Sequence, residues 1–170
     1  MTRSAIALIL DLFLVLALGA GSGALAQERQ DFNTRCDLVA EDSCQWGNLK
    51  NRNLDGKDLS DSNYKAIHLQ GASLRDATLE RINLQVSDVS GADFSRANLA
   101  HATFFAANAA GANFSAAKLE GVNFTRANLA GVNLQGAKID GSTWFVGARL
   151  GGAKWIDGRK CAENSVGKCD

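Results

Sequence analysis

The sequence predicts a repeat protein of the solenoid class, and three observations carry that prediction. Large apolar residues recur at every fifth position over most of the chain, a period that fits neither a helical turn of 3.6 residues nor the alternation of a strand. A second column of small or β-branched residues precedes each large residue by two positions. Proline is absent from the 170 residues, so every backbone N–H can bond to a neighbouring coil.

The five-residue period is kept without interruption over a long stretch of the chain. Its large residues are Leu49, Leu54, Leu59, Tyr64, Leu69, Leu74, Leu79, Leu84, Val89, Phe94, Leu99, Phe104, Ala109, Phe114, Leu119, Phe124, Leu129, Leu134, Ile139 and Trp144. We expect one inserted residue around Gly147, after which the period resumes at Leu150 and Trp155. Between the two apolar columns lie mostly Asn, Asp, Thr or Ser, and Gly often follows the large residue by two positions. Asn, Asp and Gly favour turns, which indicates a bend after each short segment.

The stretch "ANLAGVNLQGAKI", residues 127–139, resembles the consensus A-(N/D)-L-x-x of the pentapeptide-repeat family. The resemblance covers about 110 of the 170 residues. It implies an all-β fold, a right-handed quadrilateral β-helix with four pentapeptides in each coil. About five and a half coils spaced by about 4.7–4.9 Å would form a rod roughly 26 Å long. Stacking of residues that lie four pentapeptides apart predicts a nearly aromatic core column of Tyr64, Leu84, Phe104, Phe124 and Trp144.

The first coil and both ends of the rod depart from the repeat. Arg52 and Lys57 occupy inward positions of the first coil, and we expect their aliphatic stems to cover the end of the core with the charges in water. Terminal units of a solenoid must cap its open ends. The expected domains are a signal peptide (1–26), an N-terminal cap (27–46), the pentapeptide-repeat β-helix (47–156) and a C-terminal cap (157–170).

The N-terminal segment, residues 1–26, is typical of a secretory signal peptide. Arg3 precedes an apolar run from Ala5 to about Leu18, and a stretch of small residues ends at Ala26. We expect cleavage between Ala26 and Gln27 and a periplasmic or secreted protein of a Gram-negative bacterium. A retained membrane anchor is the alternative, but the run is shorter than the about 20 residues that a span needs.

The four cysteines favour disulfides, because an exported chain with an even number of cysteines usually pairs them. Zinc ligands and free thiols are the alternatives, although the chain has no CxxC pattern. Paired Cα atoms must lie within about 7 Å, and opposite ends of the expected rod are too far apart for that. The pairs should therefore be Cys36–Cys44 and Cys161–Cys169, one in each cap.

No pattern in the sequence predicts a catalytic residue, a cofactor or a metal site. His68 and His101 fall at outward positions on different sides of the expected coil, far from the cysteines. Glu80, Glu120 and Asp140 share one outward column, but neighbouring lysines would neutralise much of their charge. A solid core filled by side chains offers no pocket for chemistry, so we expect a protein that is not an enzyme.

Four residues form the candidate interface: Phe105, Phe145, Arg126 and Val86. Each phenylalanine directly follows a core position on the same side, and the other two residues lie along the adjoining edge. Exposed aromatic residues with polar neighbours can mark a protein interface. The alternative is that each ring folds against its neighbours and is buried.

The sequence favours a scaffold or protein-interaction module whose partner, or second copy, binds a flat side of the rod. The best-known members of the family shield DNA gyrase with a strongly acidic rod that resembles DNA. Residues 47–156 instead carry 12 Lys and Arg against 9 Asp and Glu, a net charge of +3. A DNA-mimic modulator of gyrase is therefore the disfavoured alternative, and we expect neither nucleic acid nor, after cleavage, a membrane as a partner.

Overall fold

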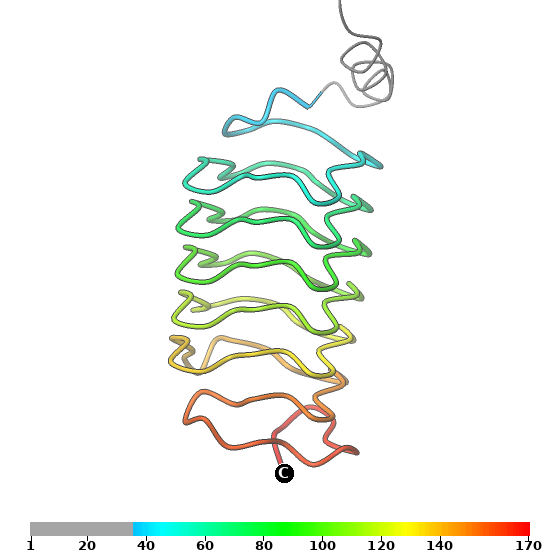
Figure 1. The fold of residues 1–170 in the computed structure, drawn as a ribbon, viewed down its shortest axis with the longest axis vertical. Helices are drawn as coiled ribbons and strands as arrows, with labels where there is room; N and C mark the ends of the chain where they lie inside the picture. The colour runs from blue at the N-terminus through cyan, green and yellow to red at the C-terminus, as the bar shows by residue number, and fades with distance from the viewer. Residues whose placement is uncertain (1–35) are drawn as a thin grey trace, which may run out of the picture. The chain divides into compact units, whose positions relative to one another are not determined.

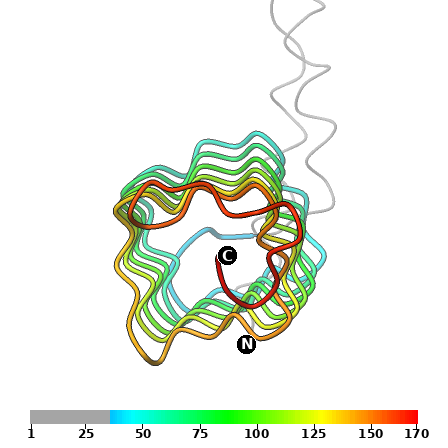
Figure 2. The same ribbon diagram turned by 90° about the horizontal axis from the view of Figure 1, so that it is seen from below.

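A computed structural model describes residues 36–170 of the chain. The predicted signal peptide and its cleavage site, Ala26 and Gln27, lie outside the described residues. Residues 36–170 form coils stacked along a single axis (Figure 1), and their outline is four-sided when seen along that axis (Figure 2). Nothing helical in this range has the length and hydropathy to cross a membrane.

Backbone pairing fixes the repeat at four pentapeptides for each coil. Isolated parallel bridges join residues that are one such repeat apart, and no helix or continuous strand occurs between residues 36 and 170. The bridges of one side connect, in order, Ser43, Asn63, Asn83, Thr103, Asn123 and Trp144. The fold is therefore a β-helix with four short sides per coil, as expected. Its right-handed sense and the number of its coils stay predictions.

The core is built from the two inward columns that the sequence predicts. The large residues from Leu49 to Leu134 are buried, and the small residues that precede them by two are buried from Ser62 onward. Phenylalanines stack between neighbouring coils, with ring centroids 5.1 Å apart both for Phe94 and Phe114 and for Phe104 and Phe124. Because the interior is narrow, each side accommodates one large and one small side chain.

The polar column between them satisfies the backbone at each turn. The backbone N–H of Gln85 donates to Oδ1 of Asn83 at 3.1 Å, and the Asn83 Nδ2 donates to Oδ1 of Asn63 on the preceding coil at 3.1 Å. Asn128 and Asn108 repeat this coil-to-coil bond at 3.0 Å. Asn is therefore favoured at this position because it closes the turn and joins the coils.

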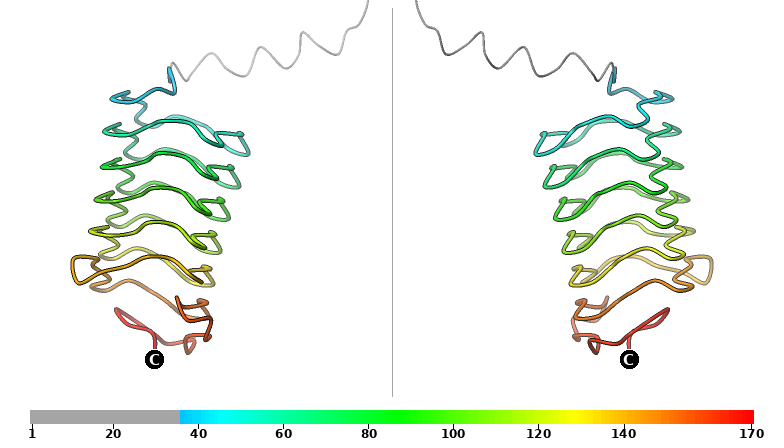
Figure 3. Two further views of the ribbon diagram at one scale, coloured as in Figure 1. Left: turned by 90° about the vertical axis from the view of Figure 1, so that its left-hand side faces the viewer. Right: turned by 90° about the vertical axis from the view of Figure 1, so that its right-hand side faces the viewer.

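The inserted residue lies earlier than the sequence predicts. Lys118 pairs with Lys138, which is one full repeat further on, but Asn123 pairs with Trp144, which lies one position beyond a full repeat. The extra residue therefore falls within residues 139–143, where the chain forms a loop that extends beyond the other coils (Figure 3, yellow to orange). The placement around Gly147 was wrong.

This shift exchanges the roles of two adjacent aromatic residues. Trp144, predicted to be in the core, is 58% exposed, whereas Phe145, predicted to be at an exposed interface, is only 9% exposed. The Phe145 ring stacks on Phe124 with centroids 5.4 Å apart and continues the aromatic column. The core position of Trp144 and the interface position of Phe145 were wrong, because the insertion turns Trp144 outward and Phe145 inward. A buried Phe145 ring is the alternative that the sequence left open.

Each end of the coil is closed by a disulfide. Cys36 pairs with Cys44 and Cys161 pairs with Cys169, with Cα atoms 5.1 Å and 4.9 Å apart. These are the predicted pairs. The C-terminal segment folds back in antiparallel bridges, Arg149 to Val166 and Lys154 to Lys160. Arg52 and Lys57 are exposed, as expected for the degenerate first coil.

We predict that Phe145→Ala lowers the free energy of unfolding by about 3 kcal/mol, since it removes a buried ring from the aromatic column. Trp144→Ala, the matched control, should change it by no more than about 0.5 kcal/mol because the indole is mainly in solvent. Urea unfolding of the two variants measures both values. If Trp144→Ala lowers the free energy of unfolding more than Phe145→Ala does, Trp144 lies in the core and the inserted residue follows it. That result would contradict the register described here.

Candidate functional site

The exposed large apolar residues are concentrated on one side of the β-helix. Four of the six in the described range lie there, namely Trp46, Val86, Trp144 and Val146, with exposed fractions of 74, 49, 58 and 69%. We call this surface the tryptophan side, and it comprises residues 43–47, 63–67, 83–87, 103–107, 123–127 and 144–148. A surface of this kind typically marks an interaction site.

The structure brings three of the four predicted interface residues together on this side. The guanidinium carbon of Arg126 lies 6.0 Å from the centroid of the half-buried Phe105 ring, within the range of a cation–π contact. The backbone N–H of Val86 donates to the carbonyl of Phe105 at 3.0 Å, so Val86 lies on the adjoining coil. Phe145, the fourth residue, forms part of the core beneath the surface.

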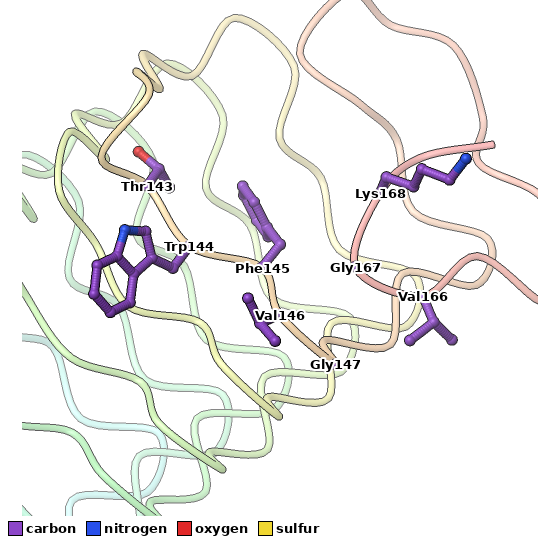
Figure 4. Close-up of a pocket in the computed structure, with 8 residues that line it drawn as sticks. All are labelled: Thr143, Trp144, Phe145, Val146, Gly147, Val166, Gly167 and Lys168. Carbon is purple, nitrogen blue, oxygen red and sulfur yellow. The ribbon is translucent and has the colours of Figure 1, made fainter.

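At its C-terminal end the tryptophan side continues into an open hollow. The residues that line it are Thr143, Trp144, Phe145, Val146, Gly147, Val166, Gly167 and Lys168. Figure 4 shows Trp144 and Phe145 pointing away from each other, and Val166 comes from the C-terminal segment. Val166 is a fifth exposed large apolar residue. The hollow is therefore mainly apolar, and among these lining residues only Lys168 carries a charge.

The tryptophan side contains no Asp or Glu, and its two charged residues are the exposed Lys65 and Arg126. Neither forms an ion pair with any residue between 36 and 170. Cations without a neighbouring carboxylate make this side electropositive and leave both groups available to a ligand.

The opposite side of the coil carries charges that are paired with each other. The Arg75 guanidinium donates to Asp55 on the preceding coil at 2.7 Å, and Arg96 donates to Asp76 in the same way at 2.7 Å. The hydrogen bond from Arg75 lowers the pKa of Asp55 to about 2, and that from Arg96 lowers the pKa of Asp76. This side is therefore a self-neutralised surface, unlike the tryptophan side.

Three of the six corners of the tryptophan side carry a large side chain in a backbone conformation that disfavours it. These corner residues are Trp46, Ala66, Val86, Ala106, Arg126 and Gly147, with φ between 50° and 67°. The corners of the next side are Asn51, Gly71, Gly91, Gly111, Gly131 and Gly152. A residue with a Cβ pays roughly 1–2 kcal/mol in this conformation, and a β-branched residue is a clear outlier. Trp46, Val86 and Arg126 therefore keep large side chains at a cost in stability, as Arg81, Arg96 and His101 do on two other sides.

Several residues of this surface were not among the predicted sites. Trp46 occupies the same corner column as Val86 but lies in the degenerate first coil, where extending the repeat backwards would have identified it. Trp144 and Val146 were assigned to the wrong positions of the repeat, because the inserted residue was expected after them and lies before them. Val166 carries no signal in the sequence, since it reaches the hollow only through its antiparallel bridge to Arg149.

Within the described range, no group of three or more His, Cys, Asp and Glu is arranged to hold a metal ion. His68 and His101 are both exposed and belong to different sides. The side chains that the structure does gather on one surface are aromatic, aliphatic and cationic. Aromatic side chains and Arg are enriched at protein interfaces.

The comparisons agree with this architecture. A family model described as a pentapeptide repeat region matches residues 57–134. A pentapeptide repeat protein from the Arabidopsis thaliana thylakoid lumen is 32% identical over 64% of this chain and 68% of its own, with a TM-score of 0.22. The chain belongs to the pentapeptide-repeat family. The pentapeptide-repeat protein alr5209 from Nostoc Pcc 7120 is similar at 33% identity over 58% of this chain and 67% of its own, with a TM-score of 0.25.

A third similar structure is QnrB1, described as a plasmid-mediated fluoroquinolone resistance protein. It is 18% identical over 72% of this pentapeptide-repeat chain and 75% of its own, with a TM-score of 0.34. At these TM-scores, the likeness carries no argument about activity or partner. No curated protein matches the chain significantly.

We predict that Val86→Gly raises the free energy of unfolding by about 0.5–1 kcal/mol, because glycine adopts the positive φ of this corner without strain. Val146→Gly is the control: the same residue type on the same side lies outside the positive-φ positions, and its replacement should lower stability by about 0.5–1 kcal/mol. Urea unfolding measures both. If both variants lose stability, the corner is not strained.

Proposed function

We propose that this protein is a non-enzymatic scaffold of the cell envelope that binds a protein partner through the tryptophan side. One observation carries the proposal: four of the six exposed large apolar residues share that side, which has no acidic residue. Trp and Arg are enriched at the energetic centres of protein interfaces.

The surface does not favour a DNA-mimic role. A mimic of DNA must present a dense array of negative charge, since DNA carries one charge per about 1.7 Å of its axis. The tryptophan side carries two cations, and the carboxylates Asp55 and Asp76 on the opposite side are engaged by arginines. A protein partner that contributes apolar surface fits this chain better.

Site-specific photo-crosslinking in the host cell tests the proposed surface. A benzophenone amino acid at Val86 or at Val146 should crosslink to the same discrete protein. Ala116 is the matched control, because it is an exposed corner residue with φ of 56° on the opposite side, and it should give no such product. Equal crosslinking from Ala116, or none from either valine, would contradict the proposal.

The envelope location is proposed from two features, the signal-like N-terminus and the two disulfides, which persist in oxidising compartments. Intact mass spectrometry of the protein from a periplasmic extract, without reductant, tests it. We expect a chain that begins at Gln27 and lacks four hydrogens because both disulfides are closed. A full-length, reduced chain from the cytoplasm would refute export.

A further inference from the structure

The charges of the tryptophan side restrict what can bind there. Its apolar residues extend from the first coil, at Trp46, to the last, at Trp144. Lys65 and Arg126 lie between them, three coils apart, with no carboxylate on the same side. Bringing apolar surface onto this side also desolvates these two cations, which is unfavourable unless the partner supplies negative charge.

A second copy of the chain does not supply that charge. If two tryptophan sides met in antiparallel orientation, the second coil of one copy would face the fifth coil of the other, and Lys65 would approach Arg126. In a parallel arrangement each cation would approach its own counterpart. Both pairings bring like charges together, and such contacts are disfavoured by several kcal/mol. The tryptophan side is therefore better suited to an acidic partner than to itself.

Backbone pairing on this side excludes binding by addition of a strand. The N–H of Leu84 donates to the carbonyl of Thr103 at 2.8 Å, and Val86 donates to Phe105 at 3.0 Å. These groups are used between coils, so no sheet edge runs along the side to accept an extended peptide. The occupant must bind through its side chains.

The spacing of the coils matches a helix. A helix rises about 5.4 Å per turn, and the coils repeat at about 4.7–4.9 Å, so a helix along the side meets nearly one coil with each turn. The distance from Trp46 to Trp144 spans five coil steps, or about 24 Å, equivalent to about 16 helical residues. Lys65 and Arg126 are separated by about 14 Å, or roughly ten helical residues.

We propose that the tryptophan side binds an amphipathic helix of a partner protein, with two acidic residues about eleven positions apart beside its apolar stripe, the same-face spacing of a helix nearest to that separation. This inference rests on the interaction surface proposed above and specifies its ligand. The stripe packs on Trp46, Val86, Phe105 and the hollow at Trp144. The acidic residues pair with Lys65 and Arg126.

Three synthetic peptides of about 18 residues, long enough as helices to span the side, are titrated into the full chain by calorimetry. The first carries a leucine stripe and Glu at two flanking positions about eleven apart, which lie on one face of a helix. The second has the same stripe with Lys at those two positions, and the third keeps Glu there but has Ser in place of the leucine stripe. We expect the first to bind at least tenfold more tightly than either of the others. The double variant Lys65→Glu with Arg126→Glu should reverse the preference between the Glu and Lys peptides. Lys50→Glu with Lys118→Glu, the same charge change on other sides, should leave it unchanged.

The other outcomes separate this inference from the proposed surface. The Glu and Lys peptides could bind equally well, and the double variant Trp46→Ala with Trp144→Ala could abolish the binding of both. That result would refute the proposal of an acidic helix but would support the tryptophan side as the interaction surface. If no peptide binds but Val86 crosslinks to a protein, the acidic helix is likewise refuted and the interaction surface is still supported. Absence of both would overturn the two proposals. If the protein binds mixed vesicles of phosphatidylcholine and phosphatidylglycerol more tightly than the Glu peptide, the ligand of this side is a membrane and not an acidic helix. If sedimentation equilibrium shows a dimer, the ligand is a second copy of the chain.

Discussion

The narrow interior of the coil is the constraint on which the rest of this structure depends. Each side admits one large residue and one small or β-branched residue, and stacked coils place equivalent residues on top of each other. Phe104, Phe124 and Phe145 form such a stack, with successive centroids 5.1 and 5.4 Å apart. Because interiors pack densely, an extra residue cannot be absorbed inside and must leave the coil as a loop. The loop within residues 139–143 is the result.

That constraint explains why the sequence predicts the register so well and where it fails. The period alone specifies the coils from Leu49 to Leu134, because no other column repeats large apolar residues as regularly, and it places Phe104 inward although Phe105 follows it. At Trp144 and Phe145 two large aromatic residues are adjacent, and either could continue the period. The deciding signal was present: counting back five from Leu150 gives Phe145, and Gly147 then falls at a corner with φ of 67°.

The outward surface is less predictable because the core imposes nothing on it. Phe105, Arg126 and Val86 could be assigned to one side from the repeat, and the structure places them together. Val166 could not, because the repeat does not specify how the C-terminal segment folds back. The cysteine pairing was predictable since only residues at the same end of the coil can approach within bonding distance.

Stability and surface chemistry oppose each other at the corners. Glycine or asparagine at every corner relieves backbone strain, and one side of this chain follows that rule completely. The three remaining sides retain large residues at positive φ, such as Arg81, Arg96 and His101. On the tryptophan side these residues are Trp46, Val86 and Arg126. Natural proteins tolerate such costs where a surface has a use. The same residues supply the apolar and cationic groups of the proposed interface.

Hydroxyl-radical footprinting of the purified protein, read by mass spectrometry, tests the central claim most directly, namely that one side of the coil presents the exposed aromatic and aliphatic residues. The account predicts rapid oxidation of Trp46, Trp144 and Val146 and protection of Phe124 and Phe145. Protection of Trp144 with oxidation of Phe145 would contradict it. That result would return Trp144 to the core and remove the C-terminal half of the proposed surface.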